Sequence, residues 1–439
     1  MTGALHELTA TDAARRIAEG SLTSQELVRA CLERIEARES VVQAWTFLDP
    51  ELALAQAQAR DATLPVGPLH GVPVGVKDAF DTYDMPTEYG SSLYASHRPR
   101  RDAAPVALAR GDGAVVLGKT VTTEFAFFAP GKTRNPHDPS RTPGGSSSGS
   151  AAAVADCMVP AAFGAQTAGS VIRPAAYCGV VGFKPSFGRI PRSGVWPLAE
   201  SLDTLGTLGR TVEDAALLAA SASGRASMRG AGPAHPPPRI GLYKTHDWER
   251  AAPESRAAVE DAARILDEAS ARLSDVPLSD SFTGLVQAHA LVMAYEASHT
   301  FAHELRENRD ALSRELVALL EQGLATSPDD YAAALRERDA AVPELARIFE
   351  EVDVLLTPSV IGEAPLGLGS TGDPLFNRAW TLLGTPAIHL PGFSGPNGMP
   401  VGVQLVGPVG GDERLLTAAR WAEERLSSRR PRARPARSA

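Results

Sequence analysis

Residues 144–188 read GGSSSGSAAAVADCMVPAAFGAQTAGSVIRPAAYCGVVGFKPSFG, and this block decides how the chain is interpreted. It opens on three consecutive serines between glycines, a composition that is typical of a flexible linker. The residues after Ser150 argue against a linker, because a helix of small residues follows and then a second apolar stretch. The serine run is therefore embedded in a folded part of the chain, and the question is what needs so many hydroxyl groups there.

The serine run could belong to either of two known motifs, a phosphate-binding loop or a nucleophile elbow. A phosphate-binding loop needs Lys-Ser or Lys-Thr after its last glycine, whereas Gly149 is followed by Ser150 and Ala151. The segment GSSSG matches the G-x-S-x-G nucleophile elbow, with Ser147 at its centre. An elbow must follow a strand, yet the preceding TRNPHDPSRTP carries three prolines. An elbow also needs a downstream histidine, and no candidate has a distinctive local context: His235, His289, His299, His303 and His389.

The composition sets the class of protein. At 439 residues and 44% hydrophobic, the chain can bury a large core, and its net charge of -9 offers no broad basic field for nucleic acid. The arginine-rich tail, residues 429–439, is expected to be disordered. Three cysteines favour a reducing compartment over a disulfide framework. No signal-peptide core and no run of 18 apolar residues occurs, so we expect a cytoplasmic protein that does not bind membranes.

Lysine is rare in this chain. Of 43 Lys and Arg residues only five are lysine, and they are Lys77, Lys119, Lys132, Lys184 and Lys244. An ammonium group can lose its proton, which a guanidinium cannot do. A lysine in an apolar segment is therefore a candidate base, and the apolar run that precedes Lys77 makes it the first choice.

The chain alternates between helical and strand-like segments. Residues 23–26, TSQE, form a capping box for a helix with one apolar face. We expect a strand ending at Lys77, then a helix, a glycine stop and a strand within residues 105–120. Strands are also predicted in RIGLY, DVLLTP, GTPAIHLPG and MPVGVQLVG, with a long helix through Val259, Leu266 and Leu273, a nearly all-helical stretch over 283–350, and a last helix over 415–426. This alternation indicates an α/β fold.

The block 144–188 resembles the signature of the amidase signature family of serine hydrolases. The segment GVPVGVKD resembles that family's lysine motif, and the resemblance continues through TEFAFFAPGKTRNPHDPSRTPGGSS, GTPAIHLPG and MPVGVQLVG. It implies a single large α/β domain with a mixed, twisted β-sheet covered by helices over residues 1–428. We expect N-terminal helices over 1–66, a catalytic core over 67–222, and a C-terminal part over 239–428 with a helical cover at 283–350.

The resemblance also implies the catalytic residues. The family's lysine falls on Lys77, its bridging serine, held by a cis peptide, on Ser146, and its nucleophile on Ser170, 24 residues later. The backbone amides of the turn that ends at Ser170 would form the oxyanion hole, and they belong to Thr167, Ala168, Gly169 and Ser170.

The chemistry follows from the side chains themselves. A serine hydroxyl attacks a carbonyl only when a base takes its proton, and lysine is a base only when neutral. Burial away from carboxylates lowers a lysine pKa, although Asp78 beside Lys77 would oppose this if it pointed inward. Ser146 would relay the proton from Ser170 to Lys77 and return it to the leaving amine.

The chain departs from the family at one point. The common form Asp-Thr-Gly-Gly-Ser-Ile-Arg is replaced by residues 166–173, in which Gln166 takes the place of the acid and Arg173 comes one position later. An ion pair between the acid position and the arginine is therefore not expected. Ser147, Ser148 and Lys184 are expected to support the backbone rather than to react.

The resulting hypothesis is hydrolysis of a C–N bond in a small neutral or aryl amide or carbamate, with no metal or organic cofactor. Substrate contacts are assigned to Phe125, Phe128, Trp380 and Gln166. The alternative is the A subunit of a glutamyl- or aspartyl-tRNA amidotransferase, which makes ammonia from glutamine for a partner. A non-catalytic scaffold is a third option, against which the complete set of Lys77, Ser146 and Ser170 argues.

Overall fold

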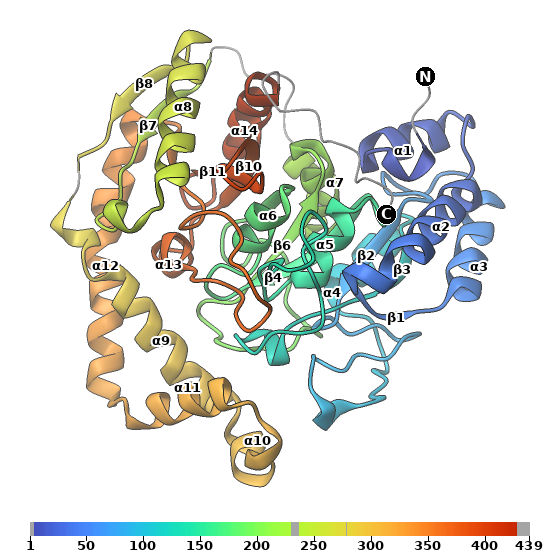
Figure 1. Ribbon diagram of the computed structural model, residues 1–439, viewed down its shortest axis with the longest axis horizontal. Helices are drawn as coiled ribbons and strands as arrows, with labels where there is room; N and C mark the ends of the chain where they lie inside the picture. The colour runs from blue at the N-terminus through green and yellow to red at the C-terminus, as the bar shows by residue number, and fades with distance from the viewer. Residues whose placement is uncertain (1–3, 230–236, 278, 428–439) are drawn as a thin grey trace.

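One mixed sheet organises the molecule. The computed structural model describes residues 4–229, 237–277 and 279–427, and within them eleven strands form this sheet (Figure 1). Across the sheet the order is β1 (Trp45–Leu48), β3 (Val115–Thr120), β2 (Pro73–Lys77), β4 (Ala161–Gln166), β6 (Thr204–Gly209), β5 (Val181–Lys184), β10 (Ala387–Ser394), β11 (Pro400–Val406), β9 (Val354–Pro358), β7 (Arg239–Leu242) and β8 (Arg272–Asp275).

The strand directions are mixed, as predicted. Strand β2 runs parallel to both β3 and β4, and β7 runs parallel to β8 and β9. The strands from β4 through β6, β5, β10 and β11 to β9 pair antiparallel. The predicted α/β class, a single domain with a mixed sheet covered by helices, is confirmed.

Helices cover both faces of the sheet. Along β3, Val116 packs into one hydrophobic cluster while Val115 and Leu117 pack into another, because successive strand residues point to opposite faces. The first face is covered by α4 (Ala104–Gly111), α7 (Val212–Ser223), α8 (Pro253–Glu268) and α14 (Asp412–Ser427). The second face is covered by α2 (Ser24–Val42), α3 (Pro50–Asp61), α5 (Ser148–Ala155) and α6 (Ile172–Cys178), and α1 (Ala10–Ala18) contributes to both clusters.

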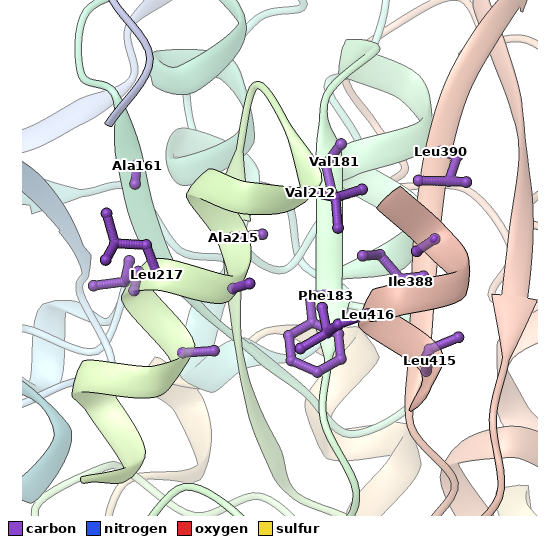
Figure 2. Packing of buried hydrophobic residues seen from close by; sticks show 14 of the residues in the cluster. Ala161, Val181, Phe183, Val212, Ala215, Leu217, Ile388, Leu390, Leu415 and Leu416 are labelled. Carbon is purple, nitrogen blue, oxygen red and sulfur yellow. The ribbon is translucent and has the colours of Figure 1, made fainter. Parts of the chain in front are cut away.

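Figure 2 shows the packing of the first face. Leu415 and Leu416 of α14 lie against Ile388 of β10 and Phe183 of β5, and all four side chains are buried. Burial of one such side chain stabilises the fold by roughly 1.5–3 kcal/mol. This packing holds the central strands rigidly, and the site is built at their ends.

A third cluster joins the helical segment to the sheet. It contains α9 (Leu285–Thr300), α11 (Arg314–Ala325), α12 (Pro328–Glu351) and α13 (Leu375–Leu382), while the short α10 (Ala302–Glu307) links α9 to α11. In Figure 1 the yellow and orange helices α9 to α12 form an arm beside the green centre of the sheet. The predicted helical stretch over 283–350 is confirmed.

Local predictions mostly hold. The capping box of α2 is present, with the Thr23 N–H donating to Glu26 Oε2 at 2.8 Å and the Glu26 N–H donating to Thr23 Oγ1 at 3.2 Å. The strands and helices expected within residues 73–120 and after residue 354 are found at their predicted places. The division at residues 66, 222 and 239 stays a prediction, and the tail 429–439 lies outside the described residues.

The long helix predicted through Leu273 is wrong. Helix α8 ends at Glu268, and Leu273 lies in β8, which pairs parallel with β7. The break falls at Ser270, whose φ of 74° is left-handed although the residue is not glycine. The sequence has no glycine or proline there that would indicate the end of the helix.

None of the helices within the described part of the chain is long and apolar enough to cross a membrane.

Candidate active site

Lys77 lies at the end of β2 and is completely buried. Its Nζ donates to Ser146 Oγ at 2.8 Å and to the Ala165 carbonyl at 3.3 Å. Burial is the main cause that lowers the pKa of Lys77 to about 7, with Asp203 opposing the shift and Arg173 adding to it. Near neutral pH a large fraction of this amine is therefore unprotonated and able to accept a proton.

Asp78 does not compensate the charge of Lys77. Its carboxylate lies 3.1 Å from Lys119 Nζ on the neighbouring strand and accepts the Glu88 N–H at 3.1 Å. The question that the sequence left open is thereby answered, because the adjacent carboxylate is committed to a second buried lysine.

Ser146 is held by a tightly bonded loop. The Gly145–Ser146 peptide bond is cis, and Gly144 has a φ of 79°, which favours glycine. Arg173 is buried and donates through Nε and Nη2 to the Gly145 carbonyl, at 3.1 and 2.7 Å, and through Nη1 to the Gly372 carbonyl at 2.6 Å. Among the residues that the structure describes, the arginine of the motif thus bonds two carbonyl groups and no carboxylate, in line with the change of the acid to Gln166.

Ser170 lies in the turn between β4 and α6. The Ser147 N–H donates to the Ser170 carbonyl at 3.4 Å, which holds the serine-rich loop against this turn. The Ser170 side chain lines a small cavity together with Phe127, Phe128 and Met293. Ser146 Oγ is bonded to Lys77 Nζ, and within the described residues no partner is found for Ser170 Oγ, which leaves that hydroxyl open to the cavity.

The backbone of the same turn offers donors. Among the described residues, no acceptor is found for the N–H groups of Ala168, Gly169 and Ser170. Gln166 Oε1 accepts the next two, from Val171 at 3.0 Å and Ile172 at 3.1 Å. Three successive unpaired amides beside a serine hydroxyl are suited to stabilise an oxyanion.

Thr167 contributes its side chain to a different bond. Its hydroxyl donates to the buried carboxylate of Asp203, which also accepts the N–H groups of Leu198 and Ala199. Burial raises the pKa of Asp203 to about 6, and the bond from Thr167 opposes that shift. Asp203 therefore ties the turn to the loop at residues 198–199.

A larger cavity adjoins the one at Ser170. Its volume is about 200 Å³, and it shares Ala126, Thr167 and Leu198 with the smaller cavity. Its lining is apolar at Trp196 and Leu205 but also carries charged groups, which are Arg192, Glu200 and Asp203. Apolar and charged surfaces therefore lie side by side in the cavity that adjoins the one at Ser170.

The four residues assigned to substrate contacts are found in different places. Phe128 lines the cavity at Ser170, and the Arg173 guanidinium lies 5.2 Å from the centre of its ring. Phe125 packs among Tyr94, Trp196 and Phe301. Trp380 lines a third cavity beside Tyr243 and Phe282, and Gln166 is buried with its side chain bonded inside the turn. Contact of these residues with substrate stays a prediction.

The neighbouring serines and Lys184 bond backbone groups, as expected. Ser147 Oγ lies 3.3 Å from both the nitrogen and the oxygen of Ala165 in β4, and Ser148 Oγ donates to the Val121 carbonyl. Lys184 Nζ donates to the carbonyls of Pro185 and Thr385. A nucleophile elbow needs an exposed hydroxyl at Ser147, and this hydroxyl is buried and engaged.

Two side chains bond this turn in a way that the sequence analysis did not predict. His289 of α9 bonds the Thr167 carbonyl at 2.8 Å, and Thr381 of α13 bonds the Ala168 carbonyl at 2.9 Å. No local pattern marks either residue, since each bonds a carbonyl more than 100 positions away in the chain. In the described part of the chain no group of three histidine, cysteine or carboxylate side chains is placed to hold a metal ion.

Comparison with known proteins places this chain in a family. Residues 26–416 match the Amidase family. The chain is 34% identical over 470 residues to the A subunit of the glutamyl-tRNA(Gln) amidotransferase of Geobacter sp. (strain M21), covering 94% of this chain and 96% of that protein.

Solved structures agree in fold. A crystal structure of an amidase superposes with a TM-score of 0.88 at 33% identity, covering 95% of this chain and all of that one. The peptide amidase of Stenotrophomonas maltophilia superposes with a TM-score of 0.81 at 30% identity, over 97% and 98% of the two chains. The chain belongs to the amidase signature family of enzymes that act on carbon–nitrogen bonds.

Proposed function

We propose that the protein hydrolyses amides through a covalent acyl-enzyme on Ser170. The observation that carries this proposal is the 2.8 Å bond between Ser146 Oγ and the amine of Lys77, a buried lysine whose pKa is lowered to about 7. A neutral amine bonded to a hydroxyl is a base with a built-in relay. The Lys77–Ser146 pair therefore supplies the base that a serine nucleophile needs to lose its proton.

The steps follow from this arrangement. Ser170 Oγ attacks the carbonyl carbon while its proton passes to Ser146 Oγ and the Ser146 proton passes to Lys77 Nζ. The negative charge on the former carbonyl oxygen is stabilised by the N–H groups of the turn, each worth about 10² to 10³ in rate. The proton then returns through Ser146 to the leaving nitrogen as the C–N bond breaks. Water attacks the acyl-enzyme by the same proton route and releases the acid.

For the substrate we propose small neutral or aryl amides, with aryl carbamates and esters as related classes. The support is the cavity at Ser170, where Phe127, Phe128 and Met293 present apolar surface. Such a surface stabilises an apolar acyl or aryl group. Arg173 also lines this cavity, but its guanidinium is engaged with the carbonyls of Gly145 and Gly372.

A second candidate is the release of ammonia from glutamine as part of an amidotransferase. The curated relatives favour it, because those at 33–35% identity are named as the A subunit of a glutamyl-tRNA(Gln) amidotransferase. The larger cavity offers matching charges, since Arg192 complements a carboxylate and Glu200 an ammonium group. A subunit of this kind works with a partner chain, which the isolated protein would lack.

Covalent labelling tests the reaction. A fluorophosphonate probe should add one mass equivalent to Ser170, and Ser170→Ala should abolish the addition, while Ser147→Ala should still be labelled. Tandem mass spectrometry locates the modified residue. Addition at Ser147 would refute the mechanism and restore the elbow interpretation.

A substrate panel separates the two candidates. With the isolated chain, release of amine from small aryl amides should exceed release of ammonia from glutamine by at least about tenfold in kcat/KM, or about 1.4 kcal/mol in transition-state binding. Aryl carbamates and esters belong in the same panel. Glutaminase activity without aryl turnover would establish the second candidate instead.

A further inference from the structure

A histidine of the helical arm is bonded to the turn behind the three unpaired amides. His289 is fully buried in α9, its Nε2 lies 2.8 Å from the Thr167 carbonyl oxygen, and its Nδ1 lies 3.1 Å from Arg378 Nη1 in α13. The chain Arg378–His289–Thr167 thus connects two helices of the C-terminal half to the turn before Ser170.

The hydrogen bonds fix the tautomer of this ring. A guanidinium only donates, so Nδ1 must accept from Arg378, and the ring proton is left on Nε2, where it faces a carbonyl that only accepts. Burial, with Arg378 adding to it, lowers the pKa of His289 to about 3, so the ring stays neutral. His289 therefore donates a permanent hydrogen bond to the Thr167 carbonyl.

A bond to this carbonyl orients the next amide. In a trans peptide the C=O and the N–H lie in one plane and point in opposite directions. The Thr167 carbonyl shares its plane with the Ala168 N–H, one of the three amides without an acceptor. When His289 pulls the carbonyl toward α9, the Ala168 N–H is held pointing away from α9. A hydrogen bond on the carbonyl also polarises the N–H of the same peptide.

Thr381 does the same for the following peptide. Gln166 Oε1 accepts two backbone N–H groups, so its amide nitrogen is the atom that lies 3.1 Å from Thr381 Oγ1 and donates to it. The Thr381 hydroxyl proton is then shared between the carbonyls of Ala168, at 2.9 Å, and Asn377, at 3.0 Å. The Ala168 carbonyl is in one plane with the Gly169 N–H, the second unpaired amide. An aspartate at position 166 would have no N–H to give to Thr381.

We propose that His289 and Thr381 are positioning residues of the oxyanion hole, which hold two carbonyls from behind and thereby aim the N–H groups of Ala168 and Gly169 at the reacting oxygen. The inference rests on the proposed acyl-enzyme function. It makes α9 and α13 part of the transition-state machinery, although neither residue touches the substrate.

The test measures how fast Ser170 reacts with the fluorophosphonate probe, whose phosphoryl oxygen needs the same donors. His289→Leu, which fills the space without a donor, should lower the maximal labelling rate by about ten- to a hundredfold, less than the full loss of a donor. The half-saturating probe concentration should stay unchanged, whereas the thermal midpoint should fall, because Arg378 and the Thr167 carbonyl both lose a buried partner. His289→Gln, which keeps a nitrogen donor, should recover most of the rate.

Two controls make the result decisive. His303→Gln changes an exposed histidine of the same arm and should label at the wild-type rate. If His289→Leu does not fold, Thr381→Val tests the second carbonyl, with Thr381→Ser as the variant that keeps the hydroxyl.

The two possible failures are distinguishable. Wild-type labelling rates in folded His289→Leu, or in folded Thr381→Val when His289→Leu does not fold, would overturn the positioning role while leaving the Ser170 mechanism in place. Equal losses in His289→Gln and His289→Leu would also overturn it, because the donor would then be irrelevant. Failure of the wild-type protein to label at Ser170 would instead refute the proposed function.

Discussion

Two strand ends of one sheet carry lysines that are alike in burial and different in partners. Lys77 ends β2 and Lys184 ends β5, both are fully buried, and burial lowers the pKa of each to about 7. Lys77 bonds the hydroxyl of Ser146, whereas Lys184 bonds the carbonyls of Pro185 and Thr385. A carbonyl has no proton to give, so Lys184 cannot act as a base toward its neighbours. On the proposed mechanism, a lowered pKa alone does not make a lysine a base for catalysis, because the partner of the amine decides whether a proton can be passed to it.

A third buried lysine completes the comparison. Lys119 in β3, the strand next to β2, has its charge compensated by Asp78 at 3.1 Å. Burial still lowers the pKa of Lys119, but Asp78 opposes the shift. By engaging that carboxylate, Lys119 keeps Asp78 from pairing with Lys77, and Asp203 is left as the carboxylate that opposes the lowered pKa of Lys77. The ion pair between Lys119 and Asp78 thus favours a neutral amine at Lys77.

The largest difference between Lys77 and Lys184 should be seen in kcat/KM when each is replaced by the same residue. Lys77→Met should lower kcat/KM by about 10² to 10⁴, the usual contribution of a general base. Lys77→Arg should fail equally, since a guanidinium stays protonated. Lys184→Met should stay within about threefold of wild type per folded molecule, because that amine takes no part in proton transfer. Steady-state kinetics on folded protein measures all three.

Either of two outcomes would contradict this comparison. Near-normal activity of Lys77→Arg would mean that position 77 needs only a positive charge. A large loss of kcat in a folded Lys184→Met variant would mean that its partners matter less than its pKa.

The pH dependence of kcat/KM should depend on Lys77 and not on Lys184. On the proposed mechanism the neutral form of Lys77 is the base, so kcat/KM should be constant above a pKa of about 7 and fall about tenfold for each pH unit below it. Lys184→Met should leave the midpoint of this acid limb in place, although Lys184 titrates in the same range. If the midpoint of the acid limb moved in Lys184→Met, the limb would belong to Lys184 and not to Lys77.

The smallest effect concerns stability, where the two lysines should be equivalent. Each is neutral in the folded state above about pH 7 and protonated in the unfolded state up to about pH 10.4, so unfolding takes up a proton in this window. The free energy of unfolding therefore rises with pH, by about 1.4 kcal/mol per unit for each lysine. Urea unfolding between pH 7.5 and 9.5 should show this slope reduced by the same amount in Lys77→Met and Lys184→Met. An unchanged slope in either variant would show that its lysine is charged when folded.

Sequence analysis reached the parts of the molecule that are encoded locally. The apolar run before Lys77 predicted a buried strand end, and the capping box at Thr23 predicted the start of α2. The assignments of Ser146 and Ser170 came from a motif resemblance, and their roles stay predictions. Leu273 was misplaced because the helix before it ends at Ser270 without a glycine.

The remaining features depend on tertiary packing. His289 was considered only as one of several histidines without context, since nothing near it in the chain shows that it meets the Thr167 carbonyl. Gln166 was noticed as a departure from the family, but its bond to Thr381 needs α13 to pack against β4. The partners of Lys184 are carbonyl groups, which every residue has and no sequence pattern can identify.

The bonds from His289 and Thr381 also order events during protein synthesis. These residues lie 122 and 213 positions after the carbonyl groups that they hold. Strand β10, which pairs with β5, also comes much later in the chain than β5. A ribosome that has released the first 284 residues has delivered Lys77, Ser146 and Ser170 but none of these partners. Contacts of such separation form late in folding. On our proposal the nascent chain carries its nucleophile and its base without an aimed oxyanion hole, so hydrolysis begins only when the C-terminal part has been made and docked.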